Sequence, residues 1–345
     1  MVNFFAEPQR SEQKPDSRCS MYILFCLAMI SLMARSEPAA WKTADYLLYH
    51  REMIKADEYM VSGNYRQALQ VMDHVFRKYD FVFLRDYQIA AQVAAFIGDQ
   101  PRAIGYLERG AAAGWKLGDI NRIRLFAKLK SGPAWPGFLR QYPKLHQRYL
   151  RKLDIAMAAR MRKMFLDDQQ LAAQNLKIND EKAQEEFLMQ RFVPQNEEQI
   201  GQLLLMIQEN GYPGEKRIGN SLWAWTILCH HNSVSPVYVS QDKLYPALRP
   251  LLLKAIASGD LSPGDFAVIE DWRITVGSDH KKSAYAYLNP IKKNELPASD
   301  RLREGIGLPS VALHNALVDV QRRTGINLYM EGKMWVKGKI PVKAD

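Results

Sequence analysis

Apolar residues recur three or four positions apart along most of this 345-residue chain, the spacing that places them on one face of an α-helix. Strand-like alternation is confined to the tail, residues 327–342, where it allows a small β-hairpin. The pattern therefore predicts an all-α fold, in which an array of helical hairpins is joined by a long helix to a second helical domain.

One pattern of small residues occurs twice, thirty-five positions apart: Ala56, Gly63 and Ala68, then Ala91, Gly98 and Ala103. Alanines let two antiparallel helices approach closely, and the space between them is expected to be filled by larger side chains, namely Tyr59, Tyr65, Met72, Val75 and Leu107. Gly63 and Gly98 are placed to end the first helix of each pair in the left-handed conformation. Asn64 and Asp99 are then expected to cap the helices that follow.

These two units resemble the tetratricopeptide repeat family over about residues 45–115, with a period close to the family's thirty-four. Two units cannot bury a continuous core alone, so a preceding helix from about Pro38 and a third pair around residues 121–149 are expected to complete the stack. The resemblance implies a concave surface that binds a peptide or a partner domain. The alternative is that the array only supports the second domain.

The second half carries its own helical pattern. Residues 144–182 predict one amphipathic connecting helix, with methionines that serve packing rather than ligand binding. Asn196 is expected to cap the next helix, and residues 220–230, apolar almost all round, are expected to form the buried central one. Further helices are predicted at 244–258, from Ser262, and at 310–324. The expected units are 1–36 (signal peptide), 37–150 (repeats), 151–190 (connecting helix) and 191–345 (helical domain).

Segments of the second half resemble an uncharacterised bacterial family over about residues 155–315. The similarity is carried by MFLDDQQ, IQENGYPGEKRIG, TILCHHN, AIASGDLSPGDFAVIEDWR and RLREGIGLPS. This chain departs from the family pattern at Tyr212, at Trp272 and where residues 284–287 replace a Tyr-Gly-Thr-Gln segment. No activity is associated with that family, so the resemblance implies a fold unit without a mechanism.

The N-terminus predicts export. The uncharged run Met21–Met33 is too short to span a bilayer but fits a signal peptide, and Ala34 and Ser36 suit cleavage before Glu37. The alternative is a buried helix, and translation could start at Met1 or Met21. The mature protein is expected to be periplasmic or secreted and to have no transmembrane helix.

Charge and cysteine content narrow the function. The net charge of +10 is spread along the chain without a basic stripe or a nucleic-acid-binding module, so nucleic acid is not an expected partner. Of the three cysteines only Cys229 lies beyond the signal, which rules out an internal disulfide and a cysteine metal site in the mature chain. No cofactor or metal is predicted.

No common catalytic motif is present, and the candidates for chemistry are four polar residues: His230, His231, Asp271 and Arg303. In a hydrolase-type enzyme, one histidine would act as general base, Asp271 would orient it and Arg303 would hold an anionic group. The structural alternatives are a capping or core histidine and an ion pair of Asp271 with Arg303 or Arg273.

Three neighbouring residues are expected to be inert: Glu270 in solvent, Asp168 on the surface and Cys229 as a buried thiol. The sequence thus leaves two hypotheses open. One is an interaction protein that binds a protein or peptide partner through its repeats, and the other is an enzyme.

Overall fold

The computed structural model describes residues 45–330 and 338–345, and across these ranges the fold is all-α with one small β element. None of the helices in these ranges has the length and apolar character needed to cross a bilayer. The predicted signal peptide and the helix expected from Pro38 lie outside the described residues.

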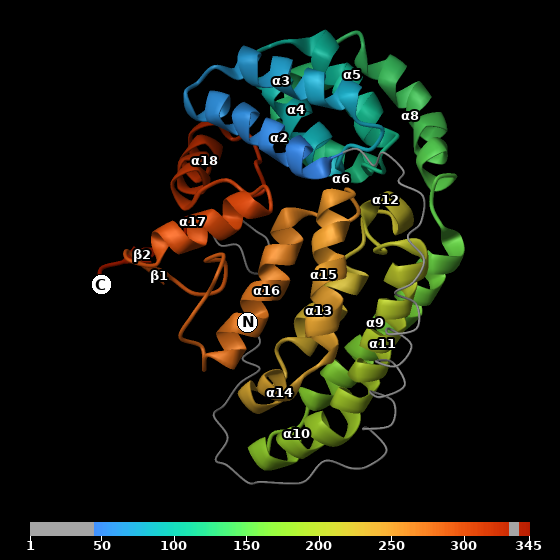
Figure 1. Ribbon diagram of the computed structural model, residues 1–345. Helices are drawn as coiled ribbons and strands as arrows, with labels where there is room; N and C mark the ends of the chain where they lie inside the picture. Colours follow the sequence, from blue (N-terminus) through green and yellow to red (C-terminus); the bar gives the residue numbers. More distant parts are fainter. Residues whose placement is uncertain (1–44, 331–337) are drawn as a thin grey trace.

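Two helical hairpins form the array at the top of Figure 1: α2 (Tyr46–Val61) with α3 (Tyr65–Lys78), and α4 (Leu84–Phe96) with α5 (Gln100–Ala111). Gly63 and Gly98 follow the first helix of each pair with φ of +78° and +80°, as predicted. Asp99 caps α5 by accepting the backbone N–H of Arg102 at 3.2 Å. Asn64 takes the N-cap position of α3, as predicted, but its side chain makes no capping hydrogen bond.

The small residues of the repeat lie where the helices touch, since Ala56, Ala68, Ala91 and Ala103 are all fully buried. Met72, Val75 and Leu107 fill the space between the helices, again as expected. Tyr59 was expected there too, but it is 39% exposed. Its neighbour Met60 takes the buried position instead, because adjacent helical residues differ in direction by about 100°.

The expected third pair is irregular. Short segments come first, α6 (Leu117–Arg122), a 3₁₀ turn (Arg124–Phe126) and α7 (Ala127–Lys130), followed by α8 (Trp135–Leu150), which packs on α5. The single connecting helix predicted for residues 144–182 is wrong, since the chain breaks at 151–154 before α9 (Ile155–Asn175). Asp154 causes the restart by capping α9, where it accepts from the Met157 N–H at 2.9 Å.

Most of the helical domain occupies the lower part of Figure 1, whereas its helix α18 (Val311–Thr324) lies beside the array. After α9 the elements of the domain are α10 (Glu181–Phe187), a π-helical turn (Leu188–Phe192), α11 (Val193–Asn210), α12 (Glu215–Ile218), α13 (Trp223–His231), α14 (Pro236–Gln241), α15 (Leu244–Ala257), α16 (Pro263–Gly277), α17 (Leu296–Gly305) and α18. Helix α13 is central as predicted, because it contacts α9, α11 and α16. Met157, Met161 and Met164 of α9 are buried in this core, which confirms their packing role.

Two sequence predictions about element ends have different outcomes. Ser262 caps α16 by accepting from the Asp265 N–H at 3.1 Å, as expected. Asn196 does not cap a helix; it lies inside α11 and is buried. Pro194 takes a first-turn position in α11, so the helix begins earlier than the predicted cap at Asn196 had indicated.

A small β element is present near the C-terminus, as expected, where the strands β1 (Ile291–Lys292) and β2 (Val342–Lys343) pair in parallel. The hairpin predicted within residues 327–342 spans positions 331–337, which lie outside the described residues. Helix α18 explains the pairing. His314 contacts the Gly338 carbonyl at 3.0 Å through Nε2, and the Asn315 side chain donates to the Ile340 carbonyl and accepts from its N–H. These bonds hold the returning chain on α18 and lead it alongside β1.

Helix α18, the last helix in the described part of the chain, packs on α2 and covers the side of the array formed by α2 and α4, which we call the inner face. Leu317 and Val320 of α18 and Ile326 and Leu328 beyond it share one hydrophobic cluster with the array. A second link comes from α12, where Glu215 accepts the Leu84 N–H at 2.6 Å. The two halves are therefore joined across the inner face.

Candidate functional site

Helix α13 ends in the two histidines that the sequence singles out, and each has its own carboxylate. His231 is buried at 1% exposure, with Nε2 3.3 Å from Oδ1 of Asp242. The side chain of His230 is 25% exposed, with Nδ1 2.8 Å from Oδ2 of Asp168. The two rings diverge because consecutive helical residues point about 100° apart. They belong to two separate sites.

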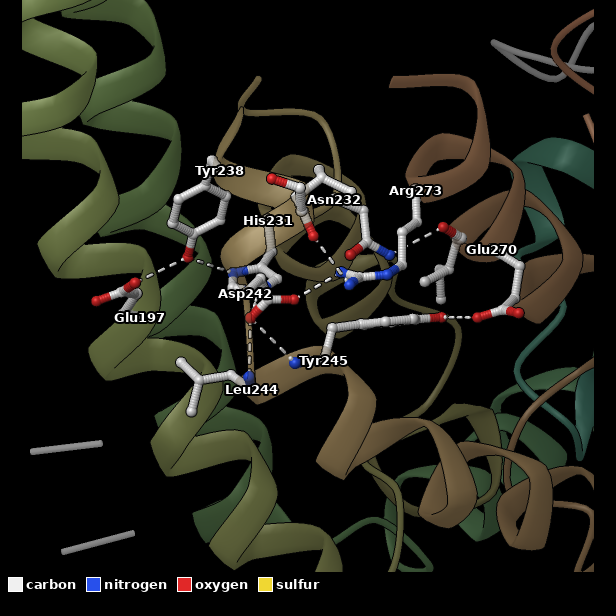
Figure 2. Close-up of polar contacts among 12 residues, drawn as sticks. Glu197, His231, Asn232, Tyr238, Asp242, Leu244, Tyr245, Glu270 and Arg273 are labelled. Atoms are coloured by element: carbon white, nitrogen blue, oxygen red, sulfur yellow. Dashed lines mark hydrogen bonds and ion pairs between the residues drawn. The ribbon is translucent and has the colours of Figure 1, made fainter. Parts of the chain in front are cut away.

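The ring of His231 is enclosed by polar groups from three elements (Figure 2). Its Nδ1 lies 2.7 Å from Oδ1 of Asn196 in α11 and 3.4 Å from the hydroxyl of Tyr238 in α14. The Tyr238 ring meets it edge-on. Both ring nitrogens thus face oxygen atoms inside the core. A general base must reach its substrate, so this enclosure favours a structural role for His231.

Asp242 connects this histidine to α16. Arg273 donates to its Oδ2 through Nη1 at 2.6 Å, and the Leu244 N–H donates to Oδ1 at 2.8 Å. Burial acts to raise the pKa of Asp242, but the His231 contact, the Leu244 N–H and Arg273 outweigh it and hold that pKa below its usual value. Asp242 therefore stays ionised as the centre of a buried network.

Glu270 extends the same polar region and corrects a sequence prediction. We expected this side chain in solvent, yet it is 6% exposed. Its carboxylate accepts the Tyr245 hydroxyl at 2.6 Å and Nε of Arg249 at 2.8 Å. Every residue of α16 from position 266 to 271 is buried, so the carboxylate of Glu270 needs these donors.

Asp271 and Arg303 are both fully buried, but they do not form the ion pair that the sequence favoured. The carboxylate of Asp271 accepts four hydrogen bonds from one loop, from the Ser283 hydroxyl and the N–H groups of Ala284, Tyr285 and Tyr287, at 2.7 to 2.8 Å. Arg303 donates to the carbonyls of Tyr285 and Pro309 at 2.6 and 2.7 Å. Asp271 therefore binds N–H groups of the 283–287 loop, and Arg303 binds a carbonyl of the same loop.

The pair of His230 and Asp168 is the remaining histidine and carboxylate arrangement. Asp168, in α9, is 1% exposed, although the sequence indicated a surface position. Its Oδ2 also accepts Nε2 of Gln169 at 3.1 Å, and the ring of Phe192 packs on His230 with centroids 5.9 Å apart. A half-open imidazole held by a buried carboxylate is an arrangement that general-base catalysis uses.

Cys229, beside these histidines, is buried, as the sequence predicts. Burial raises the pKa of its thiol well above the usual value, and the charge of Asp265 adds to the effect. The reactive form of cysteine is the thiolate, so this side chain is suited to packing and not to nucleophilic attack.

Two surface cavities lie against the array. One, of about 350 Å³, opens between α2 and α3 and is lined by Glu52, Lys55, Gln70, Val71 and His74. The other, of about 180 Å³, lies at the inner face and is lined by Leu84, Arg85, Gln88, Glu215, Asn220 and Tyr329. Neither is lined by the residues that the sequence proposes for catalysis.

Within the described ranges, no group of three or more His, Cys, Asp or Glu side chains is arranged to hold a metal ion. Comparison with known proteins adds no assignment: no family model, no curated protein and no solved structure matches this chain. Function is therefore proposed from the geometry of the described residues.

Asp242 and Glu215 were not identified from the sequence, and Asn196 was expected to cap a helix rather than to contact His231. A signal existed for Asp242, because an aspartate just before an apolar helical run is a typical cap, and Asp242 does accept the Leu244 N–H at the start of α15. No comparable signal existed for Glu215. Its partner Leu84 lies 131 positions earlier in the chain, so only the folded arrangement connects them.

Proposed function

We propose that this chain is a protein-interaction and scaffolding protein of the extracytoplasmic compartment, whose array binds amphipathic helices on its inner face. The observation that supports this most is that the array already holds α18, an amphipathic helix of its own chain, on its inner face. We call the surface of the array that contacts α18 the seat. The surface that covers α18 is thereby suited to a helix of the same chemistry from a partner.

The seat combines an apolar surface with a contact to backbone. Leu317 and Val320 are at most 1% exposed between α18 and the array. Gln92 of α4 then binds residue Asn327, accepting its N–H at 2.9 Å and donating to its carbonyl at 3.3 Å. Because both bonds go to the main chain, Gln92 can hold any extended segment that follows a helix.

Gln92 is itself 1% exposed, and its Nε2 also donates to the Gln88 carbonyl within α4 at 3.1 Å. Removing α18 would expose the apolar surface beneath it to water, at a cost of about 25 cal/mol per Å². Either α18 or an equivalent segment is therefore expected to occupy this surface.

The four catalytic candidates support the non-enzymatic proposal in a different way. Asp271 and Arg303 are hydrogen-bonded to the backbone of the 283–287 loop, and His231 is enclosed in the core. Side chains of this kind stabilise the fold, and three of the four have no exposed surface for a substrate to reach.

A peptide-binding measurement tests the proposal. A fluorescent peptide of residues 310–330 is added to the wild-type chain and to Leu317→Asp, which places a charge in the apolar seat. We expect the variant to bind the peptide at least about tenfold more tightly, because the tethered helix no longer competes at its high effective concentration. Adding Gln92→Leu to that variant should weaken peptide binding again.

Leu302→Asp is the matched control, since Leu302 of α17 is already 44% exposed. It should behave as the wild type. If the Leu317→Asp variant remains helical by circular dichroism and still binds no peptide, the inner face is not a helix-binding surface.

The location outside the cytoplasm depends on the apolar run at residues 21–33, which lies outside the described residues. Leu24→Arg interrupts that run and should keep the chain in the cytoplasm, as judged by cell fractionation. Equal export of both forms would contradict the location.

A second candidate function rests on one observation, the 2.8 Å contact of the partly exposed His230 with the buried Asp168. A carboxylate at Nδ1 favours the tautomer that carries its proton there and orients the ring for general-base activation of a water molecule. The corresponding reaction class is ester or amide hydrolysis.

Hydrolysis of a p-nitrophenyl ester tests this candidate. His230→Gln should lower the rate about a hundredfold if the ring acts as base. His74→Gln, at an exposed histidine of the array, is the control. Equal rates for both variants and the wild type would eliminate the hydrolase hypothesis and leave the binding function untouched.

A further inference from the structure

The inner-face cavity is built from three segments that are far apart in the sequence. Leu84, Arg85 and Gln88 come from the first turns of α4, Glu215 and Asn220 from the region of α12, and Tyr329 from the chain after α18. It therefore exists only when both halves of the chain are folded together. Cavities at such junctions, lined by a few convergent polar groups, are preferred places for small ligands.

Arg85 supplies the positive end of the cavity. Its side chain is 49% exposed, and its ion pair to Oδ1 of Asp86 runs through Nε at a long 3.4 Å. Asp86 is engaged more closely elsewhere, by the hydroxyl of Tyr49 at 2.5 Å. Among the described residues, no hydrogen bond to either Nη atom of Arg85 is formed. A guanidinium with two such donors suits a carboxylate, which it can bind in bidentate fashion.

Glu215 supplies an acidic group on the wall of the same cavity. Its Oε1 accepts the Leu84 N–H, which fixes the carboxyl group at the cavity wall. Burial raises the pKa of Glu215 to about 8, the Leu84 N–H lowers it, Asp86 and Asp265 raise it, and Arg85 lowers it. The carboxyl group thus lacks enough positive charge nearby to stay ionised at neutral pH, and a cationic ligand group would provide it.

Tyr329 closes the cavity in an unusual backbone conformation. Its φ is +60°, a value rare for a residue other than glycine, and its N–H is held by Oδ1 of Asn327 at 2.9 Å. Left-handed residues of this kind persist only where the surroundings impose them, and they cluster at ligand sites.

We infer that this cavity binds a small zwitterion of the free amino acid class, with its carboxylate on Arg85 and its ammonium group on Glu215. The volume agrees with that size, because about 180 Å³ slightly exceeds the roughly 150 Å³ cavity that holds a benzene ring. A molecule with roughly five to ten heavy atoms fits. A peptide terminus presents only one of the two charges and is a poorer match.

Thermal unfolding of the full chain with millimolar glycine, alanine, serine or aspartate tests the inference. At least one amino acid should raise the midpoint, because a ligand that binds only the folded state stabilises it. Acetate and methylammonium, which carry one charge each, should have little effect at the same concentration.

Variants of the two charged residues locate the site. Arg85→Gln and Glu215→Gln should each weaken amino acid affinity about tenfold or more, as expected for a lost hydrogen bond between charged groups. Glutamine at 215 keeps an acceptor for the Leu84 N–H, so the fold is preserved. Arg140→Gln and Glu209→Gln, both at exposed positions, should keep wild-type affinity.

Proton release provides a second readout. At pH 7 the binding of an ammonium group should expel about one proton from Glu215, seen as buffer-dependent heats in calorimetry. The Glu215→Gln variant should show none. The inference is overturned if no amino acid shifts the midpoint, if acetate alone gives the full shift, or if affinity survives in both charge variants.

Discussion

At the scale of single residues, the buried carboxylates of this protein are fold-determining groups. Asp271 accepts four hydrogen bonds from one loop, Asp242 joins a histidine to an arginine, and Glu270 joins a tyrosine to another arginine. A buried charge is tolerated only when it is paired or hydrogen-bonded, and each of these is satisfied differently. The sequence identifies Asp271 as exceptional but does not reveal its partners.

Asp271→Asn should destabilise the protein by about 2–4 kcal/mol, because the amide NH₂ would face N–H donors that the carboxylate now accepts. Urea unfolding followed by circular dichroism measures the loss. Asp279→Asn is the control, since Asp279 is exposed and asparagine tolerates its left-handed φ of 55°. An unchanged midpoint for Asp271→Asn would show that the loop is held by other contacts.

Two acids on the array side have raised pKa values, and they set a pH dependence. Burial raises the pKa of Asp57 to about 7 and that of Glu215 to about 8, from usual values of 3.8 and 4.5. The folded state therefore keeps protons that the unfolded state has lost. Stability should fall as the pH rises from about 4.5 to about 8 and then level off.

Glu215→Gln should remove its part of that fall. After allowance for the partial exposure of Glu215, we expect the free energy of unfolding of the variant to exceed that of the wild type by about 1–2 kcal/mol at pH 9 and by little at pH 4. The free energy of unfolding in urea at both pH values gives the comparison. A gain of equal size at both pH values would mean that ionisation of Glu215 is not its cause.

At the scale of elements, the sequence was most informative where glycine and alanine determine geometry. The left-handed conformation of Gly63 and Gly98 and the burial of the four alanines follow from local sequence, and the structure confirms both. The prediction of one continuous connecting helix is wrong at residues 151–154, where a polar capping signal interrupts an otherwise continuous helical pattern. Alternation near the C-terminus shows that a segment is extended but not which strand it pairs with, so the parallel pairing of β2 with β1 could not be predicted.

Gly98→Ala and Gly105→Ala separate backbone strain from helix propensity. An added Cβ meets nothing within 4 Å at either site, but only Gly98 has a positive φ, of +80°. Gly98→Ala should therefore cost about 1–2 kcal/mol. Gly105→Ala, in the middle of α5, should instead stabilise the protein by about 0.5–1 kcal/mol. Thermal unfolding distinguishes the signs, and a neutral Gly98→Ala would mean that the turn changes conformation.

At the scale of the whole molecule, the candidate site could be predicted only in part. Both histidines lie at the end of the most apolar helix, as the sequence indicates, but their carboxylates come from α9 and from the start of α15. Such pairs join residues 62 and 11 positions apart through packing of separate helices, which periodicity in one segment does not encode. The same holds for α18, which the sequence groups with the second half and the fold places on the array.

The seat of α18 on the inner face is the central claim, and hydrogen exchange on the full chain measures it most directly. We expect the amides of α18 and of α2 to be comparably protected in the wild type, because each helix buries the other. Leu317→Asp should sharply lower protection in α18 and at residues 326–328, while α13 keeps its protection. Rapid exchange throughout α18 in the wild type, beside a protected α2, would contradict the account.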